Sequence, residues 1–205
     1  MPEELIEYRG YRIEIEQDES PEDPRSTDEF GHMYCWHRRY NLGDKHAYNS
    51  IQEFEEEFLN KQINMNDPRG ECFALPLYLY DHSGITMSTE PFQCKWDSGQ
   101  VGWIYITKSE VFENWNNWKR LTRKRVDQII EVLRGYVKWY DEFLRGEVYG
   151  YVVVAPNGDH IDSCWGYYGD IHSEGGLLDS AREAIDSHIE WEWKMEEWVF
   201  NNFAL

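Results

Sequence analysis

The stretch Cys-Phe-Ala-Leu-Pro-Leu-Tyr-Leu-Tyr, residues 72–80, is an almost continuously apolar run. Such a run is typical of a strand buried on both faces, and we expect it to be the central strand of a sheet. Pro76 counts against this prediction, because proline donates no hydrogen bond to a neighbouring strand and prefers edges or bulges. A second run, Val-Gly-Trp-Ile-Tyr-Ile-Thr at residues 101–107, predicts another buried strand. The fold is therefore expected to be built around a sheet.

The clearest helix lies between residues 122 and 145, where apolar side chains recur at steps of three and four. These side chains are Val126, Ile129, Ile130, Leu133, Val137, Tyr140 and Leu144. A shorter helix is expected at about 50–61, because Ser50 and Glu53 have the spacing of a capping box. A last helix is expected at about 177–201. Three helices are thus predicted.

The remaining elements are predicted to be strands, residues 5–17 from alternating apolar and polar side chains and the others from the turns beside them, among them Asn41–Asp44 after residue 40. They are a strand or hairpin at 5–17, a strand at 33–40, and strands at 147–155 and 160–168 around the turn Asn157-Gly158. This order predicts an α+β fold, an antiparallel or mixed sheet of about five to six strands covered on one side by about three helices. No linker or repeat divides the chain, so a single domain over residues 1–205 is predicted.

The charge of the chain is strongly negative, with 39 acids against 20 bases and a formal net charge of −19. Most of the excess lies at the two ends: residues 1–30 carry 11 acids and 3 bases, and residues 148–205 carry 11 acids and 2 bases. A bare phosphate backbone or an anionic membrane would repel such a chain at long range. We therefore expect no direct binding to nucleic acid or to a membrane, and a basic protein as partner.

The cysteines and the N-terminus indicate a cytoplasmic protein. Four cysteines, at positions 35, 72, 94 and 164, form no CxxC pair, which favours free thiols in a reducing compartment. The first residues are acidic where a signal peptide is basic, and no apolar run approaches the roughly 18 residues of a membrane helix.

Three motifs place an aspartate, a serine and a glycine near strand ends: Asp81-His82-Ser83-Gly84, Trp96-Asp97-Ser98-Gly99-Gln100 and Asp162-Ser163-Cys164-Trp165-Gly166. If they converge, the chain is a small hydrolase or transferase. The candidate nucleophiles are Cys94 and Cys164, the bases His82 and His160, and the orienting acids Asp81, Asp97 and Asp162. The alternative is turn chemistry, in which Asp and Ser side chains bond nearby backbone groups and glycine accepts positive φ. We favour the interpretation that the three motifs form turns, and we expect a protein that is not an enzyme.

Motifs for cofactors and metals are incomplete. No glycine-rich phosphate loop and no GxGxxG after a strand is present, so no nucleotide cofactor is predicted from a motif. Cys35 and His37 have the i, i+2 spacing that places two ligands on one face of a strand. No second pair accompanies them, and no metal is predicted.

The last helix carries the sharpest functional hypothesis. Four acids, Asp179, Glu183, Asp186 and Glu190, step by 4, 3 and 4 and form one carboxylate stripe. The spacing of these carboxylates resembles the spacing of the phosphate charges along a nucleic-acid backbone. Most acidic stripes of this kind, however, are helix faces exposed to solvent. Trp191 and Trp193 lie about 200° apart on the helix, so one face cannot bury both. We hypothesise that the stripe, with Trp191 and Trp198 as aromatic anchors, binds a partner or a second copy of the chain.

Several blocks together resemble an uncharacterised family of proteins carried by phages and other mobile elements. The blocks span roughly residues 20–170 and are Asp23-Pro24-Arg25, CWHRRYNLGD at 35–44, LPLYLYDHSGITM at 75–87, WDSGQVG at 96–102 and DSCWG at 162–166. A small acidic protein of this kind is similar to antirestriction and anti-CRISPR proteins, many of which mimic DNA by charge. The resemblance gives a context and not a mechanism; by analogy with these acidic proteins, it implies an anti-defence protein that binds a basic, nucleic-acid-acting protein in the host cytoplasm. It implies no site residues.

Overall fold

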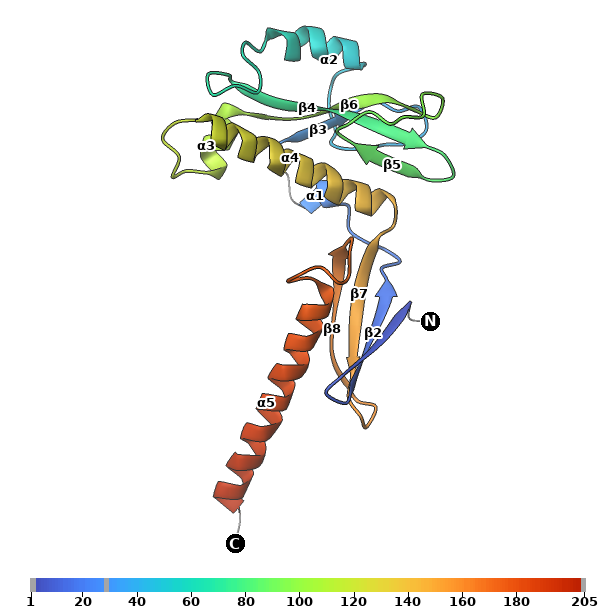
Figure 1. Cartoon of the computed structure of the whole chain (residues 1–205), viewed down its shortest axis with the longest axis vertical. Coiled ribbons are helices and arrows are strands. Elements are labelled where there is room, and N and C mark those ends of the chain that lie inside the picture. Colours follow the sequence, from blue (N-terminus) through green and yellow to red (C-terminus); the bar gives the residue numbers. More distant parts are fainter. Residues whose placement is uncertain (1–2, 28–29, 204–205) are drawn as a thin grey trace. The chain divides into compact units, whose positions relative to one another are not determined.

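The computed structural model describes residues 3–27 and 30–203, which form two compact units. Unit 1 combines the two ends of the chain, Met1–Pro21 and Gly146–Leu205, and unit 2 is the middle, Glu22–Arg145. Each unit contains its own four-stranded antiparallel sheet (Figure 1). The α+β prediction is confirmed. The described residues form eight strands in two sheets, where about five to six in one sheet were predicted, and two units where one domain was predicted.

The sheet of unit 2 has the strand order β3-β6-β4-β5. Its strands are β3 (His32–Cys35), β4 (Cys72–Asp81), β5 (Ile85–Ser88) and β6 (Ser98–Thr107). The two buried strands expected from the sequence are β4 and β6, which pair from one end to the other at the centre of this sheet. Pro76 lies opposite Trp103, next to a shift of register between Leu77 and Tyr78, so β4 tolerates its proline beside an irregularity.

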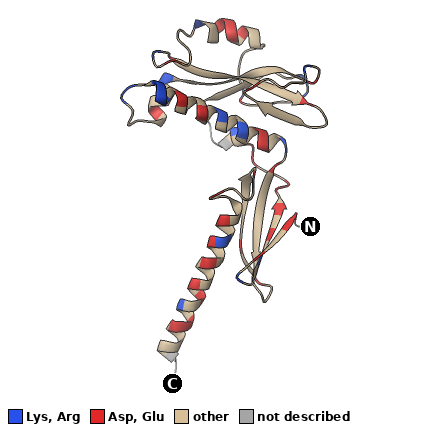
Figure 2. Cartoon of the chain, in the orientation of Figure 1, with Lys and Arg blue, Asp and Glu red and all other residues tan. Residues whose placement is uncertain are grey.

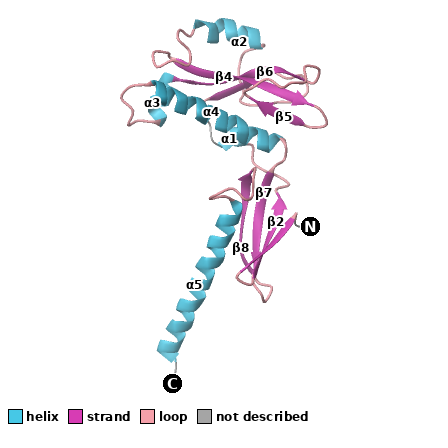
Figure 3. Ribbon diagram, in the orientation of Figure 1, coloured by secondary structure: helices cyan, strands magenta, loops and turns pink. Residues whose placement is uncertain are grey.

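Helices cover both faces of this sheet (Figure 3). Odd-numbered residues of β4, from Phe73 to Leu79, join the core formed with the long helix α4 (Arg123–Leu144), and α1 (Pro24–Thr27) and α3 (Lys108–Asn114) lie on that side. Even-numbered Cys72 and Ala74 pack instead against α2 (Ile51–Glu57) and the 3₁₀ turn η1 (Leu59–Lys61). The prediction of helices on one side is therefore wrong for unit 2. A strand that is apolar at consecutive positions needs cover on both faces, which β4 has.

Unit 1 is a sheet with one long helix. The strand order is β1-β2-β7-β8, formed by β1 (Glu4–Tyr8), β2 (Tyr11–Gln17), β7 (Val148–Val154) and β8 (His160–Tyr168). The predicted hairpins at both chain ends are thus confirmed, and β2 pairs with β7 to join them. Helix α5 (Leu177–Phe203) packs on this sheet with the buried side chains of its first half. These are Leu177, Leu178, Ala181 and Ile185.

The charge divides unevenly between the units. Unit 1 contains 19 acids and 4 bases, whereas unit 2 contains 20 acids and 16 bases. Acidic residues recur along α5 in Figure 2 with few basic ones among them. None of the described helices combines the length and the apolar character needed to cross a membrane.

Candidate functional site

Three open clefts of unit 2 have one loop, residues 36–46, as part of their walls. The Trp36 cleft has a volume of about 530 Å³ and extends from Trp36 to Asn49 along the loop. The Asp81 cleft, about 350 Å³, is bordered by the loop, the end of β4 and the start of β6. The His32 cleft, about 600 Å³, is bordered by the other side of the loop and by α1. Sequence patterns predicted a strand at 33–40, but β3 ends at Cys35 and the chain leaves the sheet there.

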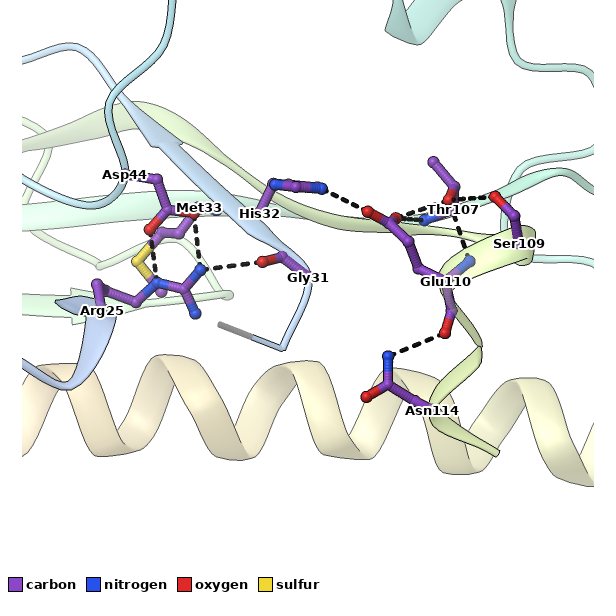
Figure 4. Close-up of polar contacts among 9 residues, drawn as sticks. All are labelled: Arg25, Gly31, His32, Met33, Asp44, Thr107, Ser109, Glu110 and Asn114. Atoms are coloured by element: carbon purple, nitrogen blue, oxygen red, sulfur yellow. Dashed lines mark hydrogen bonds and ion pairs between the residues drawn. The ribbon is translucent and has the colours of Figure 1, made fainter. Parts of the chain in front are cut away.

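A buried ion pair holds the far end of this loop (Figure 4). The Arg25 guanidinium donates from Nε and Nη2 to the two carboxylate oxygens of Asp44, each at 2.7 Å. Asp44 also accepts the backbone N–H of Met33 at 2.7 Å, and Arg25 donates to the Gly31 carbonyl at 3.0 Å. The side chains of Arg25 and Asp44 are only 3% and 15% exposed. The loop is therefore tied to β3 by charge-assisted hydrogen bonds.

Close backbone packing fixes the residue before Asp44. Gly43 has a φ of +67°, and a Cβ at this position would lie 2.3 Å from the Met33 carbonyl oxygen. Its N–H donates to the Tyr140 hydroxyl on α4 at 2.9 Å. Leu42 beside it is buried in the core. A side chain other than hydrogen is therefore excluded at Gly43, and the loop has one well-determined path.

Aromatic rings form the near end of the loop. The Trp36 indole N–H donates to the Tyr48 carbonyl at 3.1 Å, and the His46 ring lies 4.4 Å from the Trp36 ring between their centroids. Both nitrogens of His46 lie 3.1 Å from carbonyl oxygens, those of Tyr48 and Cys35. His37 stacks on Tyr40 at 5.0 Å with nearly parallel planes. These contacts orient the rings that border the Trp36 cleft.

His32, which lines the His32 cleft, contacts a hydrogen-bonded helix cap (Figure 4). Thr107 and Glu110 form a complete capping box at the start of α3, with the Thr107 N–H donating to the Glu110 carboxylate at 2.8 Å. The His32 ring nitrogen Nε2 lies 2.6 Å from the other Glu110 oxygen. Burial acts to raise the pKa of Glu110, but the hydrogen bonds from Thr107 and His32 outweigh it and lower the pKa.

Four of the predicted catalytic candidates gather beside the Asp81 cleft. Asp81 at the end of β4 donates its N–H to the Asp97 carbonyl at 2.8 Å. The Cys94 thiol lies 3.7 Å from the Asp97 carboxylate, and His82 Nδ1 lies 3.3 Å from the same oxygen. The other three candidates, His160, Asp162 and Cys164, belong to unit 1.

This arrangement differs from that of an activated nucleophile. In a triad the histidine lies between the nucleophile and the acid, so that it removes the nucleophile's proton. Here the Asp97 carboxylate lies between the Cys94 thiol and the His82 ring. Asp81 is held by Arg39 and Tyr40 from the 36–46 loop. The cluster thus fits a network that ties a turn to the loop.

Arg39 and Tyr40 were missed as partners of Asp81, because about forty residues separate them in the chain. No local pattern shows such a contact. The only available signal was that both blocks, CWHRRYNLGD and LYDHSG, are rich in polar residues at a strand end.

The third motif forms a separate polar cluster in unit 1. Tyr151 on β7 donates its hydroxyl to Asp162 on β8 at 2.7 Å. Burial and this hydrogen bond raise the pKa of Tyr151. Cys164 and His160 are exposed on β8. The hydroxyl of Tyr151 stays protonated here, and it acts as a hydrogen-bond donor between the strands.

Metal ligation has no geometric basis among the residues that the structure describes, since no three His, Cys, Asp or Glu side chains gather to hold an ion. Cys35 is buried in the core beneath α4, whereas His37 lies beyond the end of β3 and borders two clefts. Burial, together with the nearby Asp44 carboxylate, raises the pKa of Cys35 to about 12. The thiol therefore remains protonated at neutral pH.

The predicted carboxylate stripe on α5 is largely engaged in local contacts. Asp186 accepts the Tyr8 hydroxyl at 3.2 Å and pairs with Arg9 at 3.1 Å. Glu190 pairs with Lys194 at 2.6 Å, one turn later. Asp179 accepts the N–H of Gly175 at 2.8 Å and faces Arg182. Glu183 is exposed and makes no such contact with the described residues. Part of the stripe thus stabilises unit 1 itself.

The second half of α5 contains ten consecutive residues that are exposed to solvent. Every residue from 191 to 200 is exposed (Figure 1 shows α5 continuing past the end of its sheet). The apolar side chains there are Trp191, Trp193, Met195, Trp198, Val199 and Phe200, with exposed fractions from 40% to 73%. A hydrogen bond of 3.2 Å from the Tyr11 hydroxyl to Glu192 joins β2 to the start of this segment. Sequence reasoning expected cover for one of Trp191 and Trp193, and both are exposed.

The chain matches no family model, and no curated protein or solved structure is found to be similar to it.

Proposed function

We propose that the chain is a binding protein that docks onto a basic partner protein through the second half of α5, residues 190–200. The observation that carries this proposal is the exposure of all ten residues from 191 to 200, six of them apolar. Large exposed apolar patches mark interaction sites, because water contact with that surface is unfavourable. Tryptophan in particular contributes strongly to interfaces.

The apolar residues divide into two groups around the helix. Trp191, Met195 and Trp198 follow one another at steps of four and three and share one face. Trp193 and Phe200, seven residues apart, share the opposite face. A single flat contact would leave one of these groups in water. The segment is therefore suited to a groove that surrounds the helix.

The acids of the segment define the charge of the partner. Four acids, Glu190, Glu192, Glu196 and Glu197, alternate with the apolar residues, and Lys194 is the one base among them. Over its whole length α5 has seven acids and two bases, so two copies of it would repel each other. A basic, apolar-lined groove complements this surface, and proteins that act on nucleic acid have basic grooves. This chemistry supports the anti-defence role that the resemblance implies.

The first test is capture of the partner and measurement of its affinity with pure components. The tagged chain is exposed to a host lysate at about 50 mM and about 500 mM salt, where the screening length falls from above roughly 10 Å to a few ångströms. The captured protein is identified, purified and titrated against the chain. The Trp191→Ala, Trp198→Ala double variant should weaken binding by about 30-fold or more. Trp96→Ala, which removes a 96% exposed tryptophan of unit 2, is the matched control.

A second pair of variants tests the charge. Glu196→Gln with Glu197→Gln should weaken binding and reduce its salt dependence. Glu56→Gln with Glu57→Gln removes two adjacent exposed acids from α2 and should leave both unchanged. Equal effects of the two pairs, or a purified partner whose affinity is the same at both salt concentrations, would refute the proposal. A dimer of the chain that depends on Trp191 and Trp198 would also refute it.

A further inference from the structure

We propose that the Trp36 cleft of unit 2 binds a mononucleotide, with Arg38 and Lys45 at the phosphate and the ring of Trp36 beside the base. This site is independent of α5, which belongs to the other unit. The cleft's volume of about 530 Å³ lies within the range of small-molecule sites.

The first argument is the presence of cations without acidic partners in an acidic chain. Arg38 and Lys45 are exposed, both border the cleft, and neither forms an ion pair with a described residue. Asp44 is the only acid among the described residues that line the cleft. Its carboxylate is already engaged by Arg25 and by the Met33 N–H. The two cations are therefore available to an anion.

The net charge of unit 2 is small enough to permit the binding of an anion. Unit 2 has 20 acids and 16 bases, and 19 acids against 4 bases belong to unit 1. His37 also lines the cleft, and its Nδ1 accepts the Arg39 N–H, so its other ring nitrogen is the one that can contact a phosphate oxygen. A small phosphate ester is thus accommodated, whereas a long nucleic acid would meet the repulsion of the whole chain.

The second argument is the aromatic wall. Trp36 borders the cleft, and its indole is fixed by the hydrogen bond to the Tyr48 carbonyl. The stacked pair of His37 and Tyr40 also lines the cleft. Flat aromatic surfaces stack with nucleobases of any sequence. Asn41 adds an amide that both donates and accepts, as the edge of a base requires.

The third argument is that the loop is pre-formed. Its end at Asp44 is fixed by the buried pair with Arg25, and Gly43 is fixed by Tyr140 and by its close approach to Met33. A loop that is ordered before binding loses little conformational entropy when the ligand arrives. The exposed cations are thus presented by a rigid frame.

The test is calorimetric titration of the full chain with the 5′-monophosphates of the four bases, with adenosine and with inorganic phosphate as separate probes. At least one monophosphate should bind saturably below about 1 mM. Adenosine and inorganic phosphate should each bind at least about tenfold more weakly, because each lacks one half of the contacts. The indole N–H signal of Trp36 should shift in nitrogen–proton spectra on addition of the monophosphate.

Arg38→Gln and Lys45→Gln should each weaken binding by about tenfold, the effect of one lost charge-assisted hydrogen bond. Lys119→Gln, which removes an exposed cation of unit 2 outside the cleft, should leave the affinity unchanged. All three residues are exposed, so the variants should fold, as unchanged circular dichroism would show. The proposal is overturned by absence of saturable binding, by equal affinity for inorganic phosphate, or by equal effects of the three substitutions. Binding of a single-stranded oligonucleotide without binding of any monophosphate also overturns it.

Discussion

Replacing Asp44 by alanine should destabilise unit 2 by about 3–5 kcal/mol, the range measured when one partner of a buried ion pair is removed. The size of the effect follows from the contacts of this carboxylate. It accepts two hydrogen bonds from Arg25 and one from the Met33 N–H, all at 2.7 Å. The Arg25 side chain is 3% exposed, so most of its guanidinium stays out of contact with solvent when the carboxylate is removed. Asp44→Asn retains one acceptor and should cost less, about 1.5–3 kcal/mol.

The assay must distinguish the two units, because a chain of two compact units need not unfold in one step. Hydrogen exchange measured by mass spectrometry in increasing urea reports on each segment. Peptides from β4 and α4 should lose protection at lower urea in Asp44→Ala, and peptides from β7 and α5 should not change. The double variant Arg25→Met, Asp44→Ala should be more stable than the sum of the single losses predicts, because no buried charge is left unpaired. A loss below about 1 kcal/mol for Asp44→Ala, or strict additivity, would contradict the reasoning.

Two further predictions concern titrating groups. Because the folded-state pKa of Glu110 lies below its usual 4.5, its ionised form stabilises the fold above that pH, and this contribution is lost as the pH falls through the lower folded value. Urea titrations at several pH values measure this effect. The difference in unfolding free energy between wild type and Glu110→Gln should shrink as the pH falls from 6 to about 3. The control variant Glu113→Gln, at an exposed position of the same helix, should show no such change. Cys164 is exposed and should be alkylated first in the native chain, while Cys35, with its pKa raised to about 12 by burial, should react only on unfolding. Peptide mass spectrometry over time checks this, and faster labelling of Cys35 would exclude the described burial.

Local patterns predicted the elements well where one side of the element is buried. Five of the seven predicted apolar positions of α4 are buried, at 2% exposure or less, and Ile130 and Leu144 are partly buried, as a helix of period 3.6 with one covered face requires. Ser50 caps α2 by accepting the N–H of Glu53 at 3.1 Å, as the capping-box spacing predicted. Short elements were missed: β5 has four residues and α3 has seven, too few for a periodic signal.

Local sequence patterns did not predict which strands pair with each other. Strand β2 pairs with β7, and about 130 residues of unit 2 separate them. The chain passes from one unit to the other at residues 21–22 and 145–146. The first crossing lies in residues 20–26, which contain two prolines and two serines, and the second crossing, between Arg145 and Gly146, has no such stretch. The usual signal of a domain boundary is thus present at one crossing only, where the sequence indicated a loop but not a boundary.

The candidate site was predicted in part. The sequence brought Asp81, His82, Cys94 and Asp97 forward as a group, and they do lie together. Its second wall is the 36–46 loop, of which residues 36–40 were predicted as the end of a strand and residues 41–44 as a turn. The strand ends at Cys35 since the next residues pack their rings and charges around the clefts. Packing of this kind depends on contacts distant in sequence.

The insertion of unit 2 between the halves of unit 1 sets an order for folding during synthesis. The N-terminal hairpin β1-β2 leaves the ribosome first, yet β7, its partner strand, is made about 130 residues later. At the usual speed of translation the delay is on the order of ten seconds. The elements of unit 2 are made one after another during that interval, so unit 2 is forming while the hairpin still lacks its neighbour. Four glutamates, Glu4, Glu7, Glu14 and Glu16, lie on the waiting hairpin. Their repulsion discourages pairing with the hairpin of another nascent chain.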